Sequence, residues 1–269
     1  MQAHIATFSS PVTWLRRAAL ALKKSPFGMV SISIFYVFSM TALGTLPVIG
    51  LVLASLFMPF GTMLVINGTR QVFLGEQPSY AILGNLFKNA DVRARLIRVG
   101  LVYAGFILAA DFVYAVMAAD SISKWEIVND RLVWETVWPN FPWGAVGCAL
   151  LVYVIGQMAT WFAPALVAWK NMPAGKAIFY SFFGCLKNWL PIVVLLVLLT
   201  ASITGCAITV SLICQILGIS DYMLFVMTPV AFLLTAWAYG TILPMWVDIF
   251  GDVFDDILIT GNKTTYRSQ

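Results

Sequence analysis

The stretch ATWFAPALVAWKNMPAGKAIFYSFFGCLKNWLP, residues 159–191, shows how this chain is built. An apolar run ends near Trp169, a short gap holds Lys170 and Pro173, and a second helical pattern continues to Lys187. Proline suits the first turn of a helix, because the N–H that it lacks has no partner there. The stretch therefore predicts a joint, in which a short amphipathic helix connects one apolar segment to the next.

The composition indicates the solvent in which the chain folds. Of its 269 residues, 61% are hydrophobic and only 10% are charged, whereas soluble domains contain about 45–50% apolar and about 25% charged residues. A membrane-crossing helix needs about 20 mostly apolar residues, and six segments meet this requirement. We predict an all-α integral membrane protein without a separate soluble domain. The predicted spans are Phe27–Thr45, Leu51–Phe73, Leu96–Ala119, Trp143–Trp169, Trp189–Leu217 and Tyr222–Phe250.

The distribution of lysine and arginine predicts the orientation. Fourteen of the 16 basic residues fall in the N-terminal tail, at the end of the second span and after it, after the fourth span, or in the C-terminal tail 251–269. The other side holds only Lys124 and Arg131. Because cytoplasmic loops carry an excess of basic residues, we predict that both termini are cytoplasmic. The external segment Asp120–Pro142 then either lies on the outer interface through its tryptophans or binds a periplasmic partner.

The joint recurs along the chain. A proline followed by a short helix with one apolar face also occurs at Pro11 and at Pro78, and each copy precedes two predicted spans. We therefore predict one transmembrane domain, residues 1–269, built of three units, each a cytoplasmic amphipathic helix followed by a transmembrane hairpin. The units cover residues 11–73, 78–169 and 173–250, and the second spans contain Pro59, Pro164, and Pro229 with Pro244. The face predicted for the third helix consists of Ile178, Ser181, Phe182, Cys185, Leu186 and Trp189.

The same joint carries a family resemblance. The residues that carry it are Trp161–Val167, Ala177, Ser181, Phe182, Asn188 and Pro191. They resemble the signature WFAPALV…SF…N…P of uncharacterised proteobacterial inner-membrane proteins with six helices. This resemblance implies the same fold and an inner-membrane location. The layout is also similar to the membrane domain of some glycerophosphodiester phosphodiesterases, but the resemblance brings no catalytic residues and does not imply that activity.

Polar residues inside the spans form a candidate intramembrane polar site. An ionisable group in a span is costly, so we expect Asp111 in the third span to face the bundle, to be protonated, or to reach a partner. Its role is structural, or it carries protons or substrate, or it lies in water beyond a short span. Gln157, Thr209 and Asn67 complete the candidate site, although neutral polar groups also tie helices together.

Charged residues beside the spans form a candidate cytoplasmic docking site. The set consists of Arg93, Arg95, Arg98, Asp248, Asp252, Asp255 and Asp256, and the four aspartates share one helical face. This acidic face is solvated or pairs within the chain, docks a partner, or holds a divalent cation. It lacks the spacing of a calcium loop, and we predict no metal site. The dispersed basic residues favour contact with anionic lipid headgroups over nucleic acid.

The remaining observations bear on function. No catalytic motif occurs, and the single histidine, His4, excludes a histidine-based metal site or triad. None of the four cysteines forms a CxxC pair. We predict a protein without enzymatic activity or cofactor that lies in the lipid bilayer and organises or assists other envelope proteins, through a protein partner. The alternative is a permease for an amphiphilic or lipid-like small molecule, in which proline-bearing spans open a cavity beside Asp111 and Gln157.

Overall fold

The computed structural model describes residues 3–251, which are almost entirely helical. The helices are α1 (Ser10–Lys24), α2 (Pro26–Gly44), α3 (Gly50–Leu74), α4 (Ala81–Lys88), α5 (Ala90–Ile122), α6 (Trp134–Val137), α7 (Trp143–Thr160), α8 (Ala163–Trp169), α9 (Ala174–Lys187), α10 (Trp189–Ile216), η1 (Ser220–Tyr222), α11 (Met223–Gly240) and α12 (Ile242–Phe250). Two short antiparallel strands, β1 (Ile127–Val128) and β2 (Arg131–Leu132), precede α6.

Six segments of the described chain are long and apolar enough to cross a membrane, as the sequence predicts. They are α2, α3, α5, α7 with α8, α10, and η1 with α11 and α12. The third segment differs most from its predicted bounds, because α5 begins at Ala90 rather than at Leu96. Asn89 caps this helix, and its side-chain oxygen accepts the N–H of Val92 at 3.2 Å. A capped first turn of polar residues therefore extends α5 beyond its apolar part.

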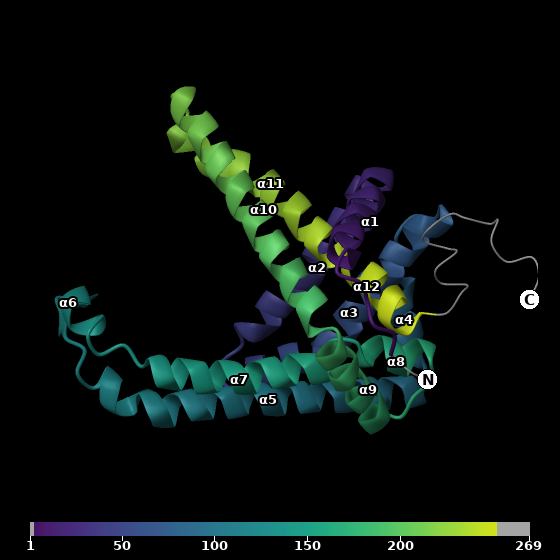
Figure 1. Ribbon diagram of the computed structural model, residues 1–269, viewed down its shortest axis with the longest axis horizontal. Helices are drawn as coiled ribbons and strands as arrows, with labels where there is room; N and C mark the ends of the chain where they lie inside the picture. The colour runs from purple at the N-terminus through teal and green to yellow at the C-terminus, as the bar shows by residue number, and fades with distance from the viewer. Residues whose placement is uncertain (1–2, 252–269) are drawn as a thin grey trace, which may run out of the picture.

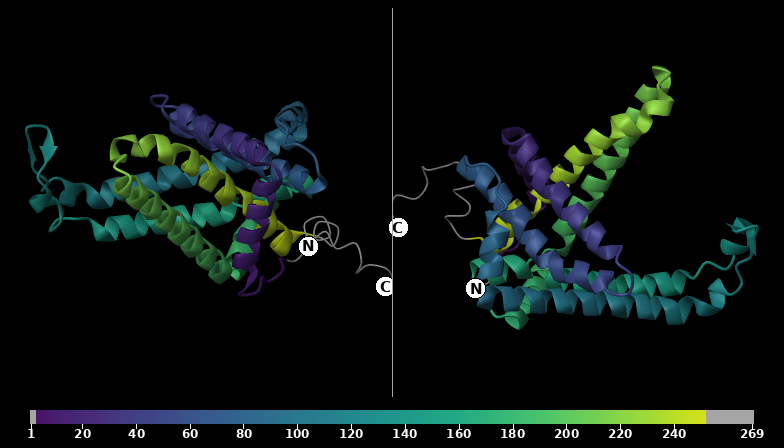
Figure 2. Two further views of the ribbon diagram at one scale, coloured as in Figure 1. Left: turned by 90° about the horizontal axis from the view of Figure 1, so that it is seen from above. Right: turned by 180° about the vertical axis from the view of Figure 1, so that it is seen from behind.

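The spans converge at one end of the molecule and diverge at the other (Figures 1 and 2). α5 lies beside α7, α10 beside α11, and α2 beside α3. α3 also packs on α5, and α2 on α11, so that the α2–α3 pair joins the other two. We call the converging end, with α1, α4, α8, α9 and α12, the vertex. We call the diverging parts of α5 and α7 (105–122, 143–155) and of α10 and α11 (197–216, 223–235) the arms.

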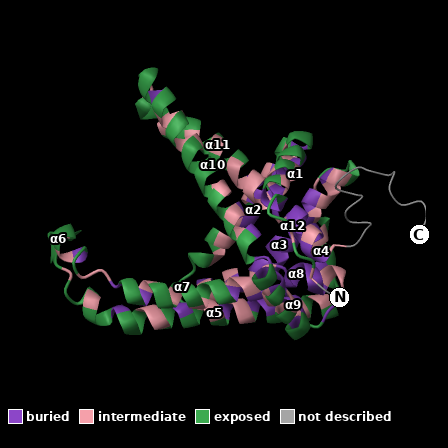
Figure 3. Cartoon of the chain, viewed as in Figure 1, coloured by how far each residue is buried: buried purple, intermediate pink, exposed green. Residues whose placement is uncertain are grey.

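The buried core lies in the vertex (Figure 3). Trp14, Phe162, Trp246 and Phe250 are each at most 1% exposed. The ring of Phe162 meets that of Phe250 edge-on at 5.4 Å between centroids. Edge-on pairs add about 0.5–1.5 kcal/mol to the stabilisation from burial alone. Aromatic packing therefore holds together helices from both ends of the chain.

The fourth span breaks where it enters the vertex. α7 ends at Thr160, and Pro164 near the start of α8 has no N–H to donate back to the preceding turn. The hydroxyl of Ser181 in α9 fills the gap: it accepts the N–H of Phe162 at 3.0 Å and donates to the carbonyl oxygen of Met158 at 2.8 Å. Ser181 therefore satisfies backbone groups that the broken helix leaves open.

The other prolines of the second spans behave in two ways. α11 gives way to α12 at Thr241, three residues before Pro244, in the same manner as the break before Pro164. Pro59 and Pro229, in contrast, lie inside the continuous helices α3 and α11. Of these four prolines, Pro164 and Pro244 follow a helix break, and Pro59 and Pro229 do not.

Asn188 anchors the end of the opening stretch. Its side chain is fully buried and donates to the carbonyl oxygens of His4 and Gly184, both at 2.9 Å. Its own side-chain oxygen accepts the N–H of Ala6 at 2.7 Å. The asparagine thus satisfies three backbone groups and fastens the N-terminal segment to α9. Two residues of the quoted stretch, Ser181 and Asn188, therefore serve the fold.

The buried face of α9 agrees only in part with the predicted one: Ser181 and Cys185 are buried, but Leu186 and Trp189 are exposed. The buried residues are small, and Ala174, Ala177 and Gly184 among them were not predicted, whereas Leu186 is 45% exposed. A Cβ on Gly184 would lie 2.4 Å from the ring of Phe250, so the glycine lets that ring approach. Lipid tails are as apolar as leucine, and helices in a bilayer bury small residues to pack closely. The expectation that the largest apolar residues face inward comes from proteins in water.

Candidate functional site

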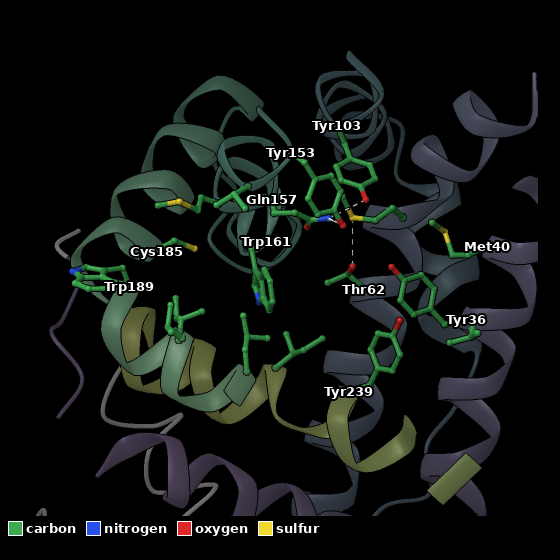
Figure 4. Close-up of a pocket in the computed structure, with 18 of the residues that line it drawn as sticks. Tyr36, Met40, Thr62, Tyr103, Tyr153, Gln157, Trp161, Cys185, Trp189 and Tyr239 are labelled. Carbon is green, nitrogen blue, oxygen red and sulfur yellow. Dashed lines mark hydrogen bonds between the residues drawn. The ribbon is translucent and has the colours of Figure 1, made fainter. Parts of the chain in front are cut away.

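Residues from all six spans line one cavity beside the vertex, where the arms begin to diverge (Figure 4). Its volume is about 780 Å³, within the range of about 300–1,000 Å³ typical of small-molecule sites. One residue from each span illustrates the lining: Tyr36 (α2), Thr62 (α3), Tyr103 (α5), Gln157 (α7), Leu196 (α10) and Tyr239 (α11). The cavity therefore depends on how the three pairs of spans are arranged.

A cluster of neutral polar groups lies on one wall of this cavity. The side-chain N–H₂ of Gln157 donates to the hydroxyl of Tyr103 at 3.1 Å and to that of Tyr153 at 2.6 Å (Figure 4). The rings of Tyr36 and Tyr239 meet edge-on at 5.3 Å between centroids and bring two more hydroxyls to the same space. We call these four tyrosines and Gln157 the tyrosine cluster.

The tyrosine cluster lies near the middle of the spans. Tyr36 follows the first residue of α2, Pro26, by ten residues, and Tyr153 follows the first residue of α7, Trp143, by the same interval. Ten residues correspond to about 15 Å at the helical rise, or half of a hydrocarbon layer about 30 Å thick. Polar groups at that depth have no bulk water to bond with, so they bond to each other or to a ligand.

The cavity carries no formal charge. Its lining, as far as residues 3–251 show, contains no aspartate, glutamate, lysine, arginine or histidine. Cys185 of α9 also lies in the lining, and burial raises the pKa of its thiol to about 12. A thiol that stays protonated is a poor nucleophile and metal ligand. The site is therefore suited to non-covalent binding of an uncharged group.

The structure does not bring the four candidate intramembrane residues together. Gln157 lines the cavity, and Asn67 is half-buried in α3. Thr209 lies on an exposed side of α10, where its hydroxyl donates to the carbonyl oxygen of Gly205 in the same helix at 2.8 Å. Asp111 is exposed on α5. Of the four, only Gln157 belongs to the cavity.

Asp111 therefore does not face the bundle, the first of the three alternatives expected for it. α3 covers α5 at Gly100, where an added Cβ would lie 2.8 Å from the Cα of Leu56. α3 begins at Gly50, only about 9 Å beyond Leu56 along its axis, whereas Asp111 lies about 16 Å beyond Gly100. The neighbouring pair of spans does not extend far enough to cover the carboxyl group.

The charged residues of the candidate docking site act mostly within the fold, as far as they are described. Asp248 accepts a hydrogen bond from the indole N–H of Trp14 at 2.6 Å and one from Arg17 at 3.2 Å, and so ties α12 to α1. Arg93 donates to the carbonyl oxygen of Phe87 at 2.6 Å, and Arg95 donates to the carbonyl oxygen and the side-chain oxygen of Asn171. Arg98 is exposed. The positions Asp252, Asp255 and Asp256 lie outside the described residues.

Sequence reasoning missed the four tyrosines of the tyrosine cluster. Tyrosine is common at membrane interfaces, where its ring is buried and its hydroxyl is wet. Tyr36 and Tyr153 instead lie about 15 Å inside their spans. A hydroxyl in the middle of a predicted span is the signal that identifies them, and it requires accurate span bounds.

Comparison with known proteins supports a membrane location. The chain is 28% identical, over 246 residues, to a probable inner membrane protein of Burkholderia thailandensis, and the match covers 88% of this chain and 90% of that protein. No family model matches the chain, and no solved structure matches it. Together with its six apolar segments, this similarity identifies the chain as a multi-pass membrane protein.

Proposed function

We propose that this protein is a non-catalytic protein of the bacterial inner membrane that binds an amphiphilic, lipid-like molecule, as a permease or a lipid carrier does. The observation that carries the proposal is the cavity of about 780 Å³ to which all six spans contribute. Most of its lining is apolar, with Val37, Met158 and Leu196 among the residues, while the tyrosine cluster supplies polar contacts. An amphiphile needs both kinds of surface.

The proposal places the vertex on the cytoplasmic side. Arg16, Arg17, Lys23 and Lys24 belong to α1 in the vertex, whereas Lys124 and Arg131 lie near α6 at the tip of one arm (Figure 1). This separation supports the orientation predicted from the excess of basic residues in cytoplasmic segments. The amphipathic helices α1, α4 and α9 then lie at the inner surface, each before one hairpin of spans. The similarity in layout to phosphodiesterase membrane domains remains a prediction.

Photo-crosslinking tests whether lipid occupies the cavity. A phospholipid with a diazirine on its acyl chain is incorporated with the purified full-length protein into nanodiscs and irradiated, and the labelled peptides are identified by mass spectrometry. We expect labelling of cavity-lining residues such as Met158 and Leu196. Leu196→Trp fills the cavity and should reduce this labelling about tenfold.

Leu212→Trp is the matched control, because Leu212 is 51% exposed on the same helix in an arm. It should leave labelling of the cavity unchanged. Equal labelling of Met158 in the wild type and in Leu196→Trp would show that lipid contacts the chain only from outside. That result would refute the proposal.

A second function, the organisation of other envelope proteins, is favoured by the arms. Only 11% of the apolar window in the α10 span is buried, compared with 67% in α3, so the α10–α11 arm offers apolar surface to the spans of a partner. Native mass spectrometry tests this role. It predicts a partner protein at fixed stoichiometry that is lost in Gly205→Leu, on an open part of α10, and retained in Leu196→Trp. A chain that remains without a partner protein would refute this role.

A further inference from the structure

The tyrosine cluster has hydrogen-bond donors to spare. Gln157 donates to the hydroxyl oxygens of Tyr103 and Tyr153. A hydroxyl that accepts a bond from an amide keeps its own proton to donate. The two hydroxyls also lie within reach of each other, but a hydroxyl proton can rotate, so both groups can donate to a third molecule that offers acceptors. Both rings belong to the lining of the cavity (Figure 4). Donors at this depth favour a ligand that offers acceptors.

The charge of the cavity restricts the ligand further. The free energy needed to transfer an unpaired ion into an apolar site is far larger than the stabilisation that one hydrogen bond provides. The lining within residues 3–251 contains no basic side chain to neutralise a phosphate or carboxylate and no acidic one to neutralise an amine. A charged headgroup would lose its hydration at the tyrosine cluster and gain no counter-charge. The polar end of the ligand is therefore uncharged.

The rest of the cavity fits hydrocarbon. Val37, Met40, Met158, Ile192, Val193 and Leu196 come from three different spans and surround the space beside the tyrosine cluster. The cavity is open rather than sealed, and it lies where the arms diverge, so that acyl chains of a lipid extend from it between the arms. A small polar solute would leave this apolar surface without a partner.

We infer that the ligand is a neutral lipid whose uncharged polar end accepts hydrogen bonds, as the ester carbonyl groups of a diacylglycerol do. Tyr103 and Tyr153 donate to its carbonyl oxygens, and Gln157 holds the two hydroxyls in position. This inference rests on the proposed function and specifies the ligand class of the same cavity. It assigns a specificity role to two tyrosines that sequence analysis did not single out.

A competition between two lipids with identical acyl chains tests the inference. The full-length protein is incubated with equimolar dioleoylglycerol and dioleoylphosphatidylglycerol, which differ in the anionic headgroup, and the lipid that it retains is measured by native mass spectrometry. We expect about tenfold preference for the diacylglycerol. Tyr103→Phe with Tyr153→Phe should lower its retention about tenfold, since each lost hydrogen bond reduces affinity several-fold. Tyr114→Phe, on α5 outside the cavity lining, should change nothing.

The outcomes separate the inference from the proposed function. Equal or stronger retention of the anionic lipid, abolished by Leu196→Trp, would overturn the inference and leave the proposed function standing. Diacylglycerol retention that survives the loss of both hydroxyls would also overturn it. Absence of any lipid retention that Leu196→Trp reduces would overturn both. The preference of the wild type needs no variant, so the test does not depend on how the phenylalanine variants fold.

Discussion

The vertex and the arms both contain many apolar residues, but they are held together in different ways. In the vertex, aromatic rings meet edge-on, Asp248 ties two helices, and Ser181 and Asn188 satisfy backbone groups where helices break or end. In the arms, most apolar side chains are exposed, and α10 and α11 lie side by side with little else packed against them (Figure 3). Apolar composition places a helix in the membrane, and specific contacts decide what it packs against.

The physical reason lies in the solvent. In water, an exposed leucine drives two helices together, whereas in a bilayer the lipid tails are equally apolar and this driving force disappears. Association then depends on close packing and on hydrogen bonds. The vertex has both, because small residues such as Gly184 admit large rings such as Phe250. The arms can remain apart, and a cavity persists where they begin to separate.

The largest change in stability that we expect is for the loss of a buried phenylalanine, compared with the loss of an exposed one. Phe162→Ala in the vertex should lower the free energy of unfolding by about 3–5 kcal/mol, through lost packing and the cavity left behind. Phe225→Ala in an arm should change it by no more than about 0.5 kcal/mol, because Phe225 is 79% exposed. Unfolding in mixed micelles, followed by circular dichroism, measures both. Similar losses for the two variants would mean that the arms pack as tightly as the vertex.

The next largest change in stability is expected for alanine substitutions at two glycines. Gly100 lies where α5 meets α3, and an added Cβ would be 2.8 Å from the Cα of Leu56, a backbone atom that cannot turn aside. Gly100→Ala should therefore destabilise the protein by about 1–3 kcal/mol.

Gly205 is the matched position in an arm, with nothing within 4 Å of its added Cβ. Gly205→Ala should stabilise the protein by about 0.5–1 kcal/mol, because alanine loses less backbone freedom than glycine in a helix. Thermal unfolding of both variants in the same nanodiscs provides the measurement. A loss of stability in Gly205→Ala would reveal a packing partner for that face.

The smallest effect at neutral pH concerns the thiol of Cys185. Burial raises its pKa from 9.0 to about 12, so the folded protein holds this proton in a pH range where the unfolded chain releases it. The free energy of unfolding should be unaffected below about pH 9 and should fall by about 1.4 kcal/mol per pH unit above it. Iodoacetamide at pH 8 should leave Cys185 unmodified until detergent unfolds the protein.

Cys185→Ser is the control for this last prediction, because it removes the titrating thiol. The variant should lose the part of the alkaline decline in stability that the thiol causes. Modification of Cys185 at pH 8 in the folded protein, at the rate found after unfolding, would show that the vertex opens around α9.

The sequence predicted those features of the fold that depend on neighbouring residues along the chain. Pro11 and Pro173 mark the starts of α1 and α9, and runs of apolar residues place all six spans. The breaks before Pro164 and Pro244 were visible only as prolines inside spans, since Pro59 and Pro229 share that pattern and break nothing. Whether a proline separates two helices depends on partners such as Ser181, which tertiary structure supplies.

The cavity could not be predicted from the sequence, for a different reason. Tyr36 and Tyr239 are separated by about 200 residues and meet because α2 packs on α11. No local pattern encodes that packing. Asp111 stood out because a charge in a span is costly, yet the structure leaves it exposed on α5. The free-energy cost of a charged group in a span marks the residue as unusual. Only the arrangement of the helices shows what its side chain contacts.

The bond between Trp14 and Asp248 joins residues 234 positions apart, and this separation has a consequence for biosynthesis. At about 5–20 residues per second, a ribosome needs roughly 12–47 s to add the intervening chain. During that time α1 has been made but its partner α12 has not, so the bond between them can form only after all the spans have been synthesised. A message that stops before α12 would yield inserted spans whose vertex cannot close.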